Sequence, residues 1–403
     1  MKLEKMCPNK VYSGKQIQKQ NFNSRDYSWP LWPILPLYPY GQRRTLRKEI
    51  VKDTIWTFDQ LQGIFYVTVP IRMTIVRMIG GGLFVYAPIA PTGECVSLVN
   101  ELVEKYGEVR YIILPTISGL EHKVYVGPFA RKFPTAAVFV TPNQWSFPLN
   151  LPLSWLGLPG NRTYLLPVNS QDTPFAAEFD YATLGPLDIG IRPFAEVVFW
   201  HRLSQTLLAV DTVLSVPAEP PDILHLDPYP LLFHAKDNVF DVVEDTPMNR
   251  CIGWQKICLF GLYFQVDALD VVPTGEILKN VGKASDRSKR AYFGLLPWQW
   301  KSDWQSSFKQ LRQDGRLLVA PILQTLILNR NPKQVMEWVD KVTKWNFRQI
   351  IPSHFDVLIQ ASGYEFRQGF SFLEKDSGGY LPEIDLKFLR QLDDKLKKIG
   401  VLH

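Results

Sequence analysis

Residues 109–122 read VRYIILPTISGLEH, and the fold of the whole chain can be argued outward from this stretch. Its first six residues are rich in β-branched and aromatic side chains, which favours a β-strand. Pro115 ends that strand, and a short polar turn follows. Residues 126–132 then have a helical pattern. The stretch therefore predicts a strand, a turn that carries polar side chains, and a helix.

This unit resembles the metal-binding loop of the metallo-β-lactamase fold, in which a buried strand ends in Thr-His-x-His-x-Asp-His. On that pattern Thr116 matches the threonine, and Glu121 and His122 match the Asp-His pair. The other two histidine positions fall on Ile117 and Gly119, whose side chains cannot ligate a metal. The resemblance implies a loop that has kept its outline and lost half of its ligands.

The segments before the loop fit the same fold. Four of them read as successive strands, namely residues 55–58, 64–69, 73–78 and 83–87. Thr92 can cap a helix that Gly107 ends. This order resembles the opening of the metallo-β-lactamase fold, so we expect an α/β (α+β) protein built as an αββα sandwich.

Two further positions match the family pattern. A strand at residues 206–210 ends in Asp211, where the family has an aspartate that bridges two metals. Residues 347–351 form a strand that stops shortly before His354, where the family has its last histidine. A further family histidine should lie near residues 192–195, and none is present there; His201 is close in sequence but falls in a predicted hairpin turn.

A closer resemblance is to the DUF4336 family, whose cyanobacterial and plastid members are related to metallo-β-lactamases. It is carried by PIRMT at residues 70–74, GLFVYAPIAPT at 82–92, FWH at 199–201, TLL at 206–208 and Asp211. The resemblance spans roughly residues 27–354. It implies a fold and a photosynthetic host, but no reaction that can be carried over.

Four candidate ligands remain on this pattern: Glu121, His122, Asp211 and His354. Two imidazoles and two carboxylates suit a single Zn, Fe or Mn ion, bound at low occupancy, that could activate a water molecule. The other interpretation is a relic site without a cofactor, in which His122 and Asp211 hydrogen-bond each other. In either case we expect these four side chains to converge at one end of the sheets.

The length of 403 residues allows one large domain with insertions, or two domains. We expect a domain at residues 55–403 with insertions at about 142–174 and 217–300, and helices at its C-terminal end. Pro332 suits a first helical position, and a last amphipathic helix should begin near Pro382.

An N-terminal arm, residues 1–54, precedes this domain. Residues 1–50 contain ten Lys/Arg and three Asp/Glu, a balance of +7, and the full chain carries +6, which leaves −1 for the remainder. The arm is either a solvated tail or a contact for nucleic acid or an anionic membrane. Its proline-rich aromatic strip, residues 27–40, predicts an extended path in which Trp29, Trp32, Tyr38 and Tyr40 are largely buried.

Four cysteines without a Cys-x-x-Cys pair indicate free thiols in a reducing compartment. The first twenty residues lack the apolar segment of a signal peptide, and the longest apolar run, residues 317–328, is too short to cross a bilayer. We therefore expect a cytoplasmic protein, or a protein of the plastid stroma if the host is a plant or alga.

Three hypotheses follow. The first is a non-catalytic binding or scaffold protein whose partner is a protein or a small molecule. The second is a mononuclear metal-dependent hydrolase of an ester, thioester or amide. The third is an RNA- or membrane-associated protein that uses the basic arm. The lost ligand positions favour the first, because a dinuclear hydrolase needs both of them.

Overall fold

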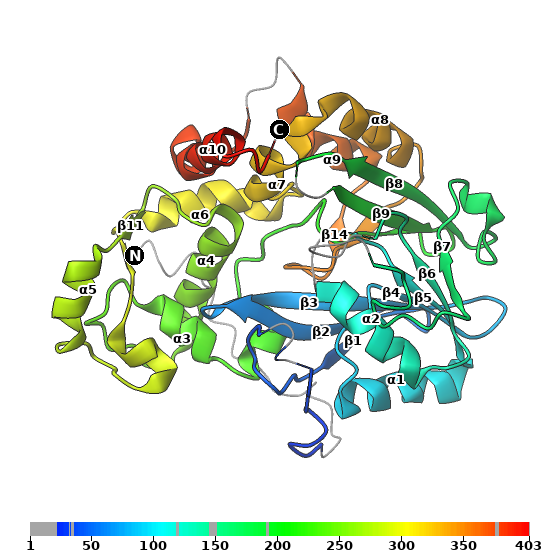
Figure 1. Ribbon diagram of the computed structural model, residues 1–403, viewed down its shortest axis with the longest axis horizontal. Helices are drawn as coiled ribbons and strands as arrows, with labels where there is room; N and C mark the ends of the chain where they lie inside the picture. Colours follow the sequence, from blue (N-terminus) through cyan, green and yellow to red (C-terminus); the bar gives the residue numbers. More distant parts are fainter. Residues whose placement is uncertain are drawn as a thin grey trace.

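A computed structural model describes residues 22–31, 33, 36–117, 121–144, 151–190, 193–374 and 379–402. Trp32 and Gly119 lie outside the described residues. Within these ranges the strands form sheets of seven, five and two strands. The two larger sheets lie face to face, and helices cover their outer sides (Figure 1).

The first sheet combines an antiparallel half with a parallel half. Residues 109–114 form a strand as predicted, and five of these six residues are buried, which is typical of a strand inside a parallel sheet. In order across the sheet, the strands are β1 (Leu46–Val51), β2 (Ile55–Ile64), β3 (Val67–Arg77), β4 (Leu83–Tyr86), β5 (Val109–Leu114), β6 (Ala137–Val140) and β7 (Thr163–Leu165).

The second sheet supplies the strand ends that carry two of the candidate ligands. Strand β10 pairs in parallel with β13, so the carboxyl ends of both strands lie at the same edge of the sheet. In order across the sheet, the strands are β14 (Ile359–Gln360), β13 (Gln349–Ile351), β10 (Thr206–Leu208), β9 (Phe194–His201) and β8 (Phe179–Leu187). His201 ends β9 and is fully buried, so its predicted place in the turn is wrong.

Helices pack on the outer face of each sheet. Helices α1 (Gly93–Tyr106) and α2 (Glu121–Lys132) share a hydrophobic core with the first sheet. Helices α8 (Pro332–Val342) and α9 (Gly363–Gln368) share another with the second sheet. An aromatic core fills the space between the sheets, where the ring centres of Phe84 and Phe179 stack at 4.1 Å. The predicted αββα sandwich is confirmed.

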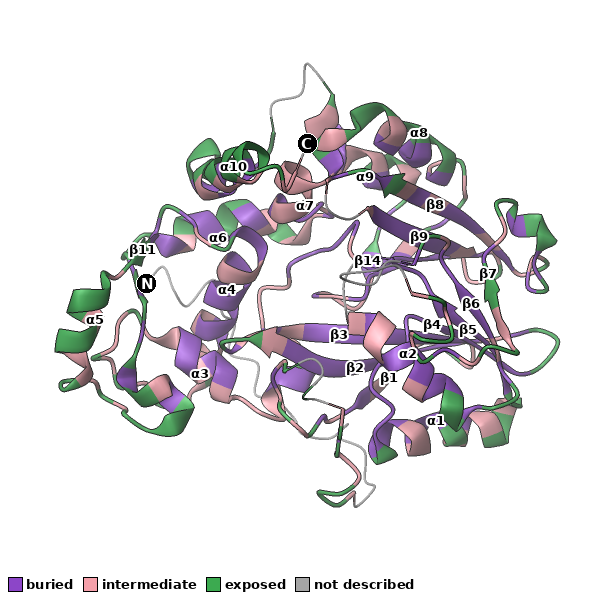
Figure 2. Ribbon diagram, in the orientation of Figure 1, coloured by how far each residue is buried: buried purple, intermediate pink, exposed green. Residues whose placement is uncertain are grey.

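A helical lobe extends from the sandwich beside the far end of β2 and β3 (Figure 1). Figure 2 shows buried inner faces on α3 and α4, whereas α5 has no buried residue. The lobe contains α3 (Tyr229–Ala235), α4 (Pro247–Tyr263), α5 (Thr274–Val281), α6 (Trp304–Arg312), α7 (Pro321–Leu326), α10 (Glu383–Lys398), β11 (Leu269–Val271) and β12 (Trp298–Trp300).

Strands β2 and β3 form one long hairpin, where the sequence had predicted three short strands. Its turn consists of Phe65 and Tyr66, both with left-handed φ angles, 50° and 63°. Asparagine and glycine are the residues that normally mark such a turn, so the sequence gives no local signal for it. Because the hairpin is long, its tip reaches into the helical lobe.

The N-terminal arm lies on its own domain where the structure describes it. Trp29 and Tyr38 are buried, and Tyr38 exchanges two backbone hydrogen bonds with Gly63 near the hairpin tip. Tyr40 is 48% exposed, so its predicted burial is wrong. The arm therefore adds a short extended segment beside β2 and uses only part of its aromatic strip for packing.

Cys95 and Cys258 are buried free thiols, but Cys251 is disulfide-bonded, so the expectation of free thiols is wrong for that residue. Among the helices in the described ranges, none is both long enough and apolar enough to cross a membrane.

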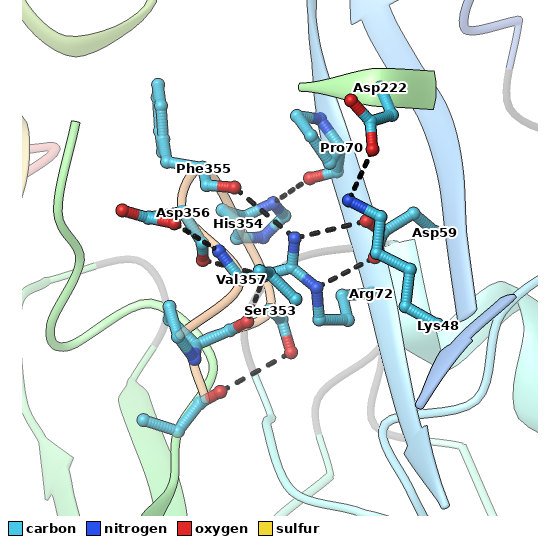
Figure 3. A network of polar contacts seen from close by, with 12 residues as sticks. Lys48, Asp59, Pro70, Arg72, Asp222, Ser353, His354, Phe355, Asp356 and Val357 are labelled. Atoms are coloured by element: carbon cyan, nitrogen blue, oxygen red, sulfur yellow. Dashed lines mark hydrogen bonds and ion pairs between the residues drawn. The ribbon is translucent and has the colours of Figure 1, made fainter. Parts of the chain in front are cut away.

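A buried guanidinium joins the two sheets. Arg72 on β3 forms a bidentate pair with Asp59 on β2, at distances of 2.7 and 3.2 Å. Its other N–H groups donate to the carbonyls of Pro352, Phe355 and Asp356, in the loop that follows β13 (Figure 3). All five N–H donors of the side chain are therefore used, and the loop is fixed against the first sheet.

We predict that Arg72→Leu lowers the free energy of unfolding by about 3–5 kcal/mol, because it leaves the Asp59 carboxylate buried without its partner. Denaturant unfolding followed by circular dichroism measures the change. The matched control is Arg390→Leu, which breaks an exposed pair with Glu383 and should cost about 0–1 kcal/mol. Equal costs for the two variants would contradict the role assigned to Arg72.

Candidate functional site

The structure brings Glu121, His122, Asp211 and His354 together at the carboxyl ends of the strands. Glu121 and His122 begin helix α2, whereas Asp211 follows β10 and His354 follows β13. His354 Nε2 lies 3.2 Å from Asp211 Oδ1, and the ring centres of His122 and His354 are 6.5 Å apart. Glu121 is close enough for its pKa to respond to the charges of Asp211 and His354.

Both imidazoles are oriented by backbone carbonyls. His354 Nδ1 lies 2.9 Å from the carbonyl oxygen of Pro70, and His122 Nδ1 lies 3.0 Å from that of Pro88. A carbonyl only accepts hydrogen bonds, so each Nδ1 carries a proton. Each ring therefore directs Nε2 away from its carbonyl, and Nε2 is the nitrogen that can bind another group.

His354 is a charged imidazolium. Its two nitrogens face two acceptors, the Pro70 carbonyl and the Asp211 carboxylate, so both carry protons. Burial disfavours the charged ring, but the hydrogen bond and charge of Asp211 and the charge of Glu121 outweigh it and raise the pKa of His354 to about 9. Asp211 and His354 therefore form an ion pair, with the Asp211 pKa held below its usual range despite burial.

His122 is neutral and has an unused acceptor. Burial and the neighbouring charge of His354 lower the pKa of His122 to about 4. With its proton on Nδ1, the buried Nε2 atom has a bare lone pair and has no partner among the described residues. The predicted hydrogen bond between His122 and Asp211 is therefore wrong, because Asp211 pairs with His354 instead.

Glu196 is a further site residue that the family pattern does not indicate. Its carboxylate is fully buried and accepts the backbone N–H groups of residues 210, 211 and 212, together with the Thr212 hydroxyl, at 2.7–2.9 Å. Burial and the charge of Asp211 raise the pKa of Glu196 to about 7. Glu196 thus fixes the turn that presents Asp211. A lone carboxylate inside the apolar run AEVVF was the available signal.

A metal pair does not fit the loop. Ile117, at the first of the two missing ligand positions, is fully buried, and its N–H donates to the Ala195 carbonyl. In the described part of the chain, no group of three or more His, Cys, Asp or Glu side chains has the spacing to hold a metal ion. The groups here whose chemistry suits a cation are the unused Nε2 of His122 and the carboxylates of Glu121 and Asp211, so the donor set fits at most one ion.

A cavity of about 600 Å³ opens beside the ion pair. Glu121, Asp211 and His354 contribute polar groups to its wall, and most of the remaining wall is apolar. That wall comes from the arm, the β2–β3 hairpin, α4 and α7, through Leu37, Val67, Phe260, Phe264 and Leu323. The volume and the few convergent polar groups are typical of a small-molecule site.

The comparison with family models shows which family the chain belongs to. Residues 52–372 match the model described as "Domain of unknown function (DUF4336)", which is most of the chain. The chain is a member of the DUF4336 family. Its DUF4336 region contains all four residues of the predicted site as well as Glu196. No curated protein matches the chain.

Several solved structures align with this DUF4336 protein at low identity. A metal-soaked flavodiiron core from Synechocystis sp. PCC6803 is 11% identical, with 89% of this chain and 70% of that chain covered and a TM-score of 0.44. The DIM-1 metallo-β-lactamase exposed to ceftazidime is 13% identical, with coverages of 83% and 98% and a TM-score of 0.39. A metallo-β-lactamase from Pontibacter korlensis is 12% identical, with coverages of 83% and 100% and a TM-score of 0.36.

At these scores the alignments carry no argument about activity. The metallo-β-lactamase-like fold class rests on the two facing sheets and their outer helices, as described above.

The ion pair makes stability depend on pH. Because the folded pKa of His354, about 9, exceeds its ordinary value of 6.5, the pair stabilises the fold fully below pH 6.5 and loses this effect as pH rises through 9. We predict that the loss of unfolding free energy in His354→Gln, on the order of 2 kcal/mol at pH 6, shrinks steadily up to pH 10.

Denaturant unfolding across this pH range measures the effect, taken as the difference between the wild type and His354→Gln. The control is His225→Gln, because burial and the charge of Arg250 lower the pKa of His225, so its contribution to stability does not decline as the pH rises. A His354→Gln difference that stays constant between pH 6 and 10 would show that His354 is not charged in the fold.

Proposed function

We propose that this DUF4336 protein is a non-catalytic binding protein that holds a small, largely apolar molecule in the cavity beside the ion pair of Asp211 and His354. The observation that carries the proposal is the cavity of about 600 Å³, whose wall is mostly hydrocarbon except where Glu121, Asp211 and His354 converge. Burial of apolar ligand surface would supply the affinity, and the three polar side chains would fix the ligand's orientation.

The state of the ion pair supports binding rather than catalysis. His354 has both nitrogens engaged as donors, so it has no lone pair with which to act as a base or a ligand. Ile117 places hydrocarbon where the metallo-β-lactamase loop has a ligand. The proposal therefore excludes the dinuclear reactions of that fold, including β-lactamase, glyoxalase and nuclease activity.

The alternative is a mononuclear metal-dependent hydrolase of an ester, thioester or amide. The observation that favours it is the bare Nε2 of His122. In addition, backbone carbonyls hold both imidazoles in place, as hydrogen-bond acceptors do behind the histidine ligands of metal sites. Glu121, His122, Asp211 and His354 would hold one Zn, Fe or Mn ion at low occupancy. When bound, the ion would supply an activated water at neutral pH.

We further propose a host and a cellular compartment for this protein. The DUF4336 resemblance suggests a photosynthetic host, with the protein in the cytoplasm or, in a plant or alga, in the plastid stroma. A contact of the basic arm with nucleic acid or an anionic membrane stays a proposal, since residues 1–21 lie outside the described residues.

Filling the cavity tests the binding role. We expect decanol, an uncharged apolar probe, to bind the wild type, and Leu323→Trp to weaken this binding about tenfold or more, because the indole occupies the ligand's volume. Isothermal titration calorimetry measures both affinities. The control is Ile384→Trp at an exposed position of α10, which should bind as the wild type does. Equal affinity in all three proteins would contradict binding in this cavity.

Metal analysis separates the two candidate functions. We expect at most one metal equivalent per chain, since the second ion lacks its ligands. We also expect no zinc-dependent hydrolysis of ester, thioester or amide substrates, since both nitrogens of His354 are engaged as donors. Elemental analysis without added metal, followed by turnover assays with zinc, provides the measurement. Zinc-dependent turnover that is lost in both His122→Ala and His354→Ala, and kept in the control His225→Ala, would establish the alternative in place of the binding role.

A further inference from the structure

Large hydrophobic side chains are exposed where the cavity opens. Ile64 ends β2, Phe65 begins the hairpin turn and Phe264 follows α4; they line the cavity and are 58%, 55% and 43% exposed. A side chain that lines a cavity and is also exposed marks its opening, so these three residues form the apolar rim of the cavity. The Phe65 ring lies 5.5 Å from that of Tyr292, which hydrogen-bonds the exposed Tyr40 and so widens the patch.

The backbone gives no reason for aromatic side chains at these positions. Phe65 and Phe264 have left-handed φ angles, 50° and 61°. Tyr292 and Phe293, beside them, also have left-handed φ angles, 50° and 58°. Glycine and asparagine adopt such angles at a lower cost than a bulky residue does, and exposure of the rings to water is a second cost. Burial of the rim in another apolar phase would remove the second cost.

A basic loop lies beside the rim. Residues 283–290 contain four Lys/Arg and one Asp, a balance of +3. The loop is attached to the hairpin because the Tyr66 hydroxyl donates to the Arg290 carbonyl at 3.0 Å. Arg290 also pairs with Asp227. The other three basic side chains are exposed and form no ion pair with any residue that the structure describes: Lys283, Arg287 and Lys289.

The acidic side chains near the loop do not cancel this charge. Through Ser285 the loop packs on residues 239–241, where Asp237 is paired with Lys256. The charge of Asp241 acts on the neighbouring Lys236, which opposes it. Counting Asp227 against the loop still leaves a balance of +2 next to the rim.

We infer that the protein docks on an anionic lipid bilayer through the apolar rim and the loop 283–290, with the opening of the cavity toward the membrane. The rim enters the boundary between head groups and acyl chains, and the loop contacts the anionic head groups. The positive charge comes from this loop and not from the N-terminal arm. The inference goes beyond the proposed binding role and rests on the rim, so each can fail without the other.

The charge and the position of the rim favour a bilayer over a second copy of the chain. A symmetric contact between two rims would bring together two loops of the same charge, which repel each other. An anionic bilayer instead attracts the loop and covers the rim. It is also a phase in which an apolar ligand dissolves, and a cavity that opens on it exchanges such a ligand without exposing it to water.

Flotation of the full chain with lipid vesicles tests the inference. Vesicles of phosphatidylcholine alone are compared with vesicles that contain about one-third phosphatidylglycerol, at neutral pH. We expect the wild type to bind the anionic vesicles about tenfold or more tightly than the neutral ones, and high salt to remove this difference. This comparison does not depend on how any variant folds.

Substitutions at the rim locate the contact. Ile64→Thr combined with Phe65→Asn should weaken binding to anionic vesicles about tenfold or more, because two apolar side chains are lost. Asparagine adopts a left-handed φ readily, so the turn is kept. The matched control is Val168→Thr combined with Tyr364→Asn, at exposed positions that do not line the cavity, and it should bind as the wild type does.

Substitutions in the loop test the source of the charge. A variant with glutamine in place of its three unpaired basic residues should bind neutral vesicles as the wild type does and lose the preference for anionic vesicles. The changes are Lys283→Gln, Arg287→Gln and Lys289→Gln, all at exposed positions. A variant that keeps the full preference would overturn the role of the loop.

The remaining outcomes separate docking from the binding role. If the wild type does not float with anionic vesicles, or the rim variant binds them as the wild type does, membrane docking is overturned. If sedimentation velocity shows a dimer that the rim variant dissociates, a second copy covers the rim and docking is again overturned. Decanol binding without flotation leaves the binding role standing alone, whereas flotation that is weakened in the rim variant, without decanol binding, leaves docking standing alone.

Discussion

The structure depends on the buried pair between Arg72 and Asp59. The pair lies on the first sheet, and its guanidinium also binds three carbonyls of the loop that carries His354 (Figure 3). A charge this deeply buried is tolerated only when every donor is satisfied, so the loop has one position relative to β3. Phe355 in that loop has a left-handed φ of 57°, a conformation that the contact with Arg72 helps to maintain.

On the second sheet a buried carboxylate, that of Glu196, positions Asp211, as the buried guanidinium of Arg72 positions the loop that carries His354. Glu196 on β9 binds the backbone of residues 210–212, and β9 is itself joined to the end of β5 by hydrogen bonds at residues 115–117. Two buried charges on facing sheets therefore position the two members of one ion pair. The site is pre-formed by the framework, which suits a binding protein that does not rearrange.

The sequence was sufficient where structure is decided locally. It predicted β5 to the residue, the cap at Thr92, the end of α1 at Gly107, and the four residues that meet at the site. The sequence did not predict the features that depend on contacts between segments far apart in the chain. The turn at Phe65 and Tyr66 lacks turn residues, and Glu196 is defined by a loop that is remote until the sheet forms. The cavity is built from segments between Leu37 and Phe355, so no local pattern predicts it.

The central claim is that this end of the sandwich holds an imidazolium ion pair and a bare acceptor instead of a metal centre. Nitrogen-15 NMR of the histidine side chains tests it directly, on the full chain at neutral pH before and after chelation. The account predicts protons on both nitrogens of His354, a neutral His122 protonated only on Nδ1, and no change with chelator. An unprotonated Nε2 on His354 whose signal shifts when metal is removed would contradict it.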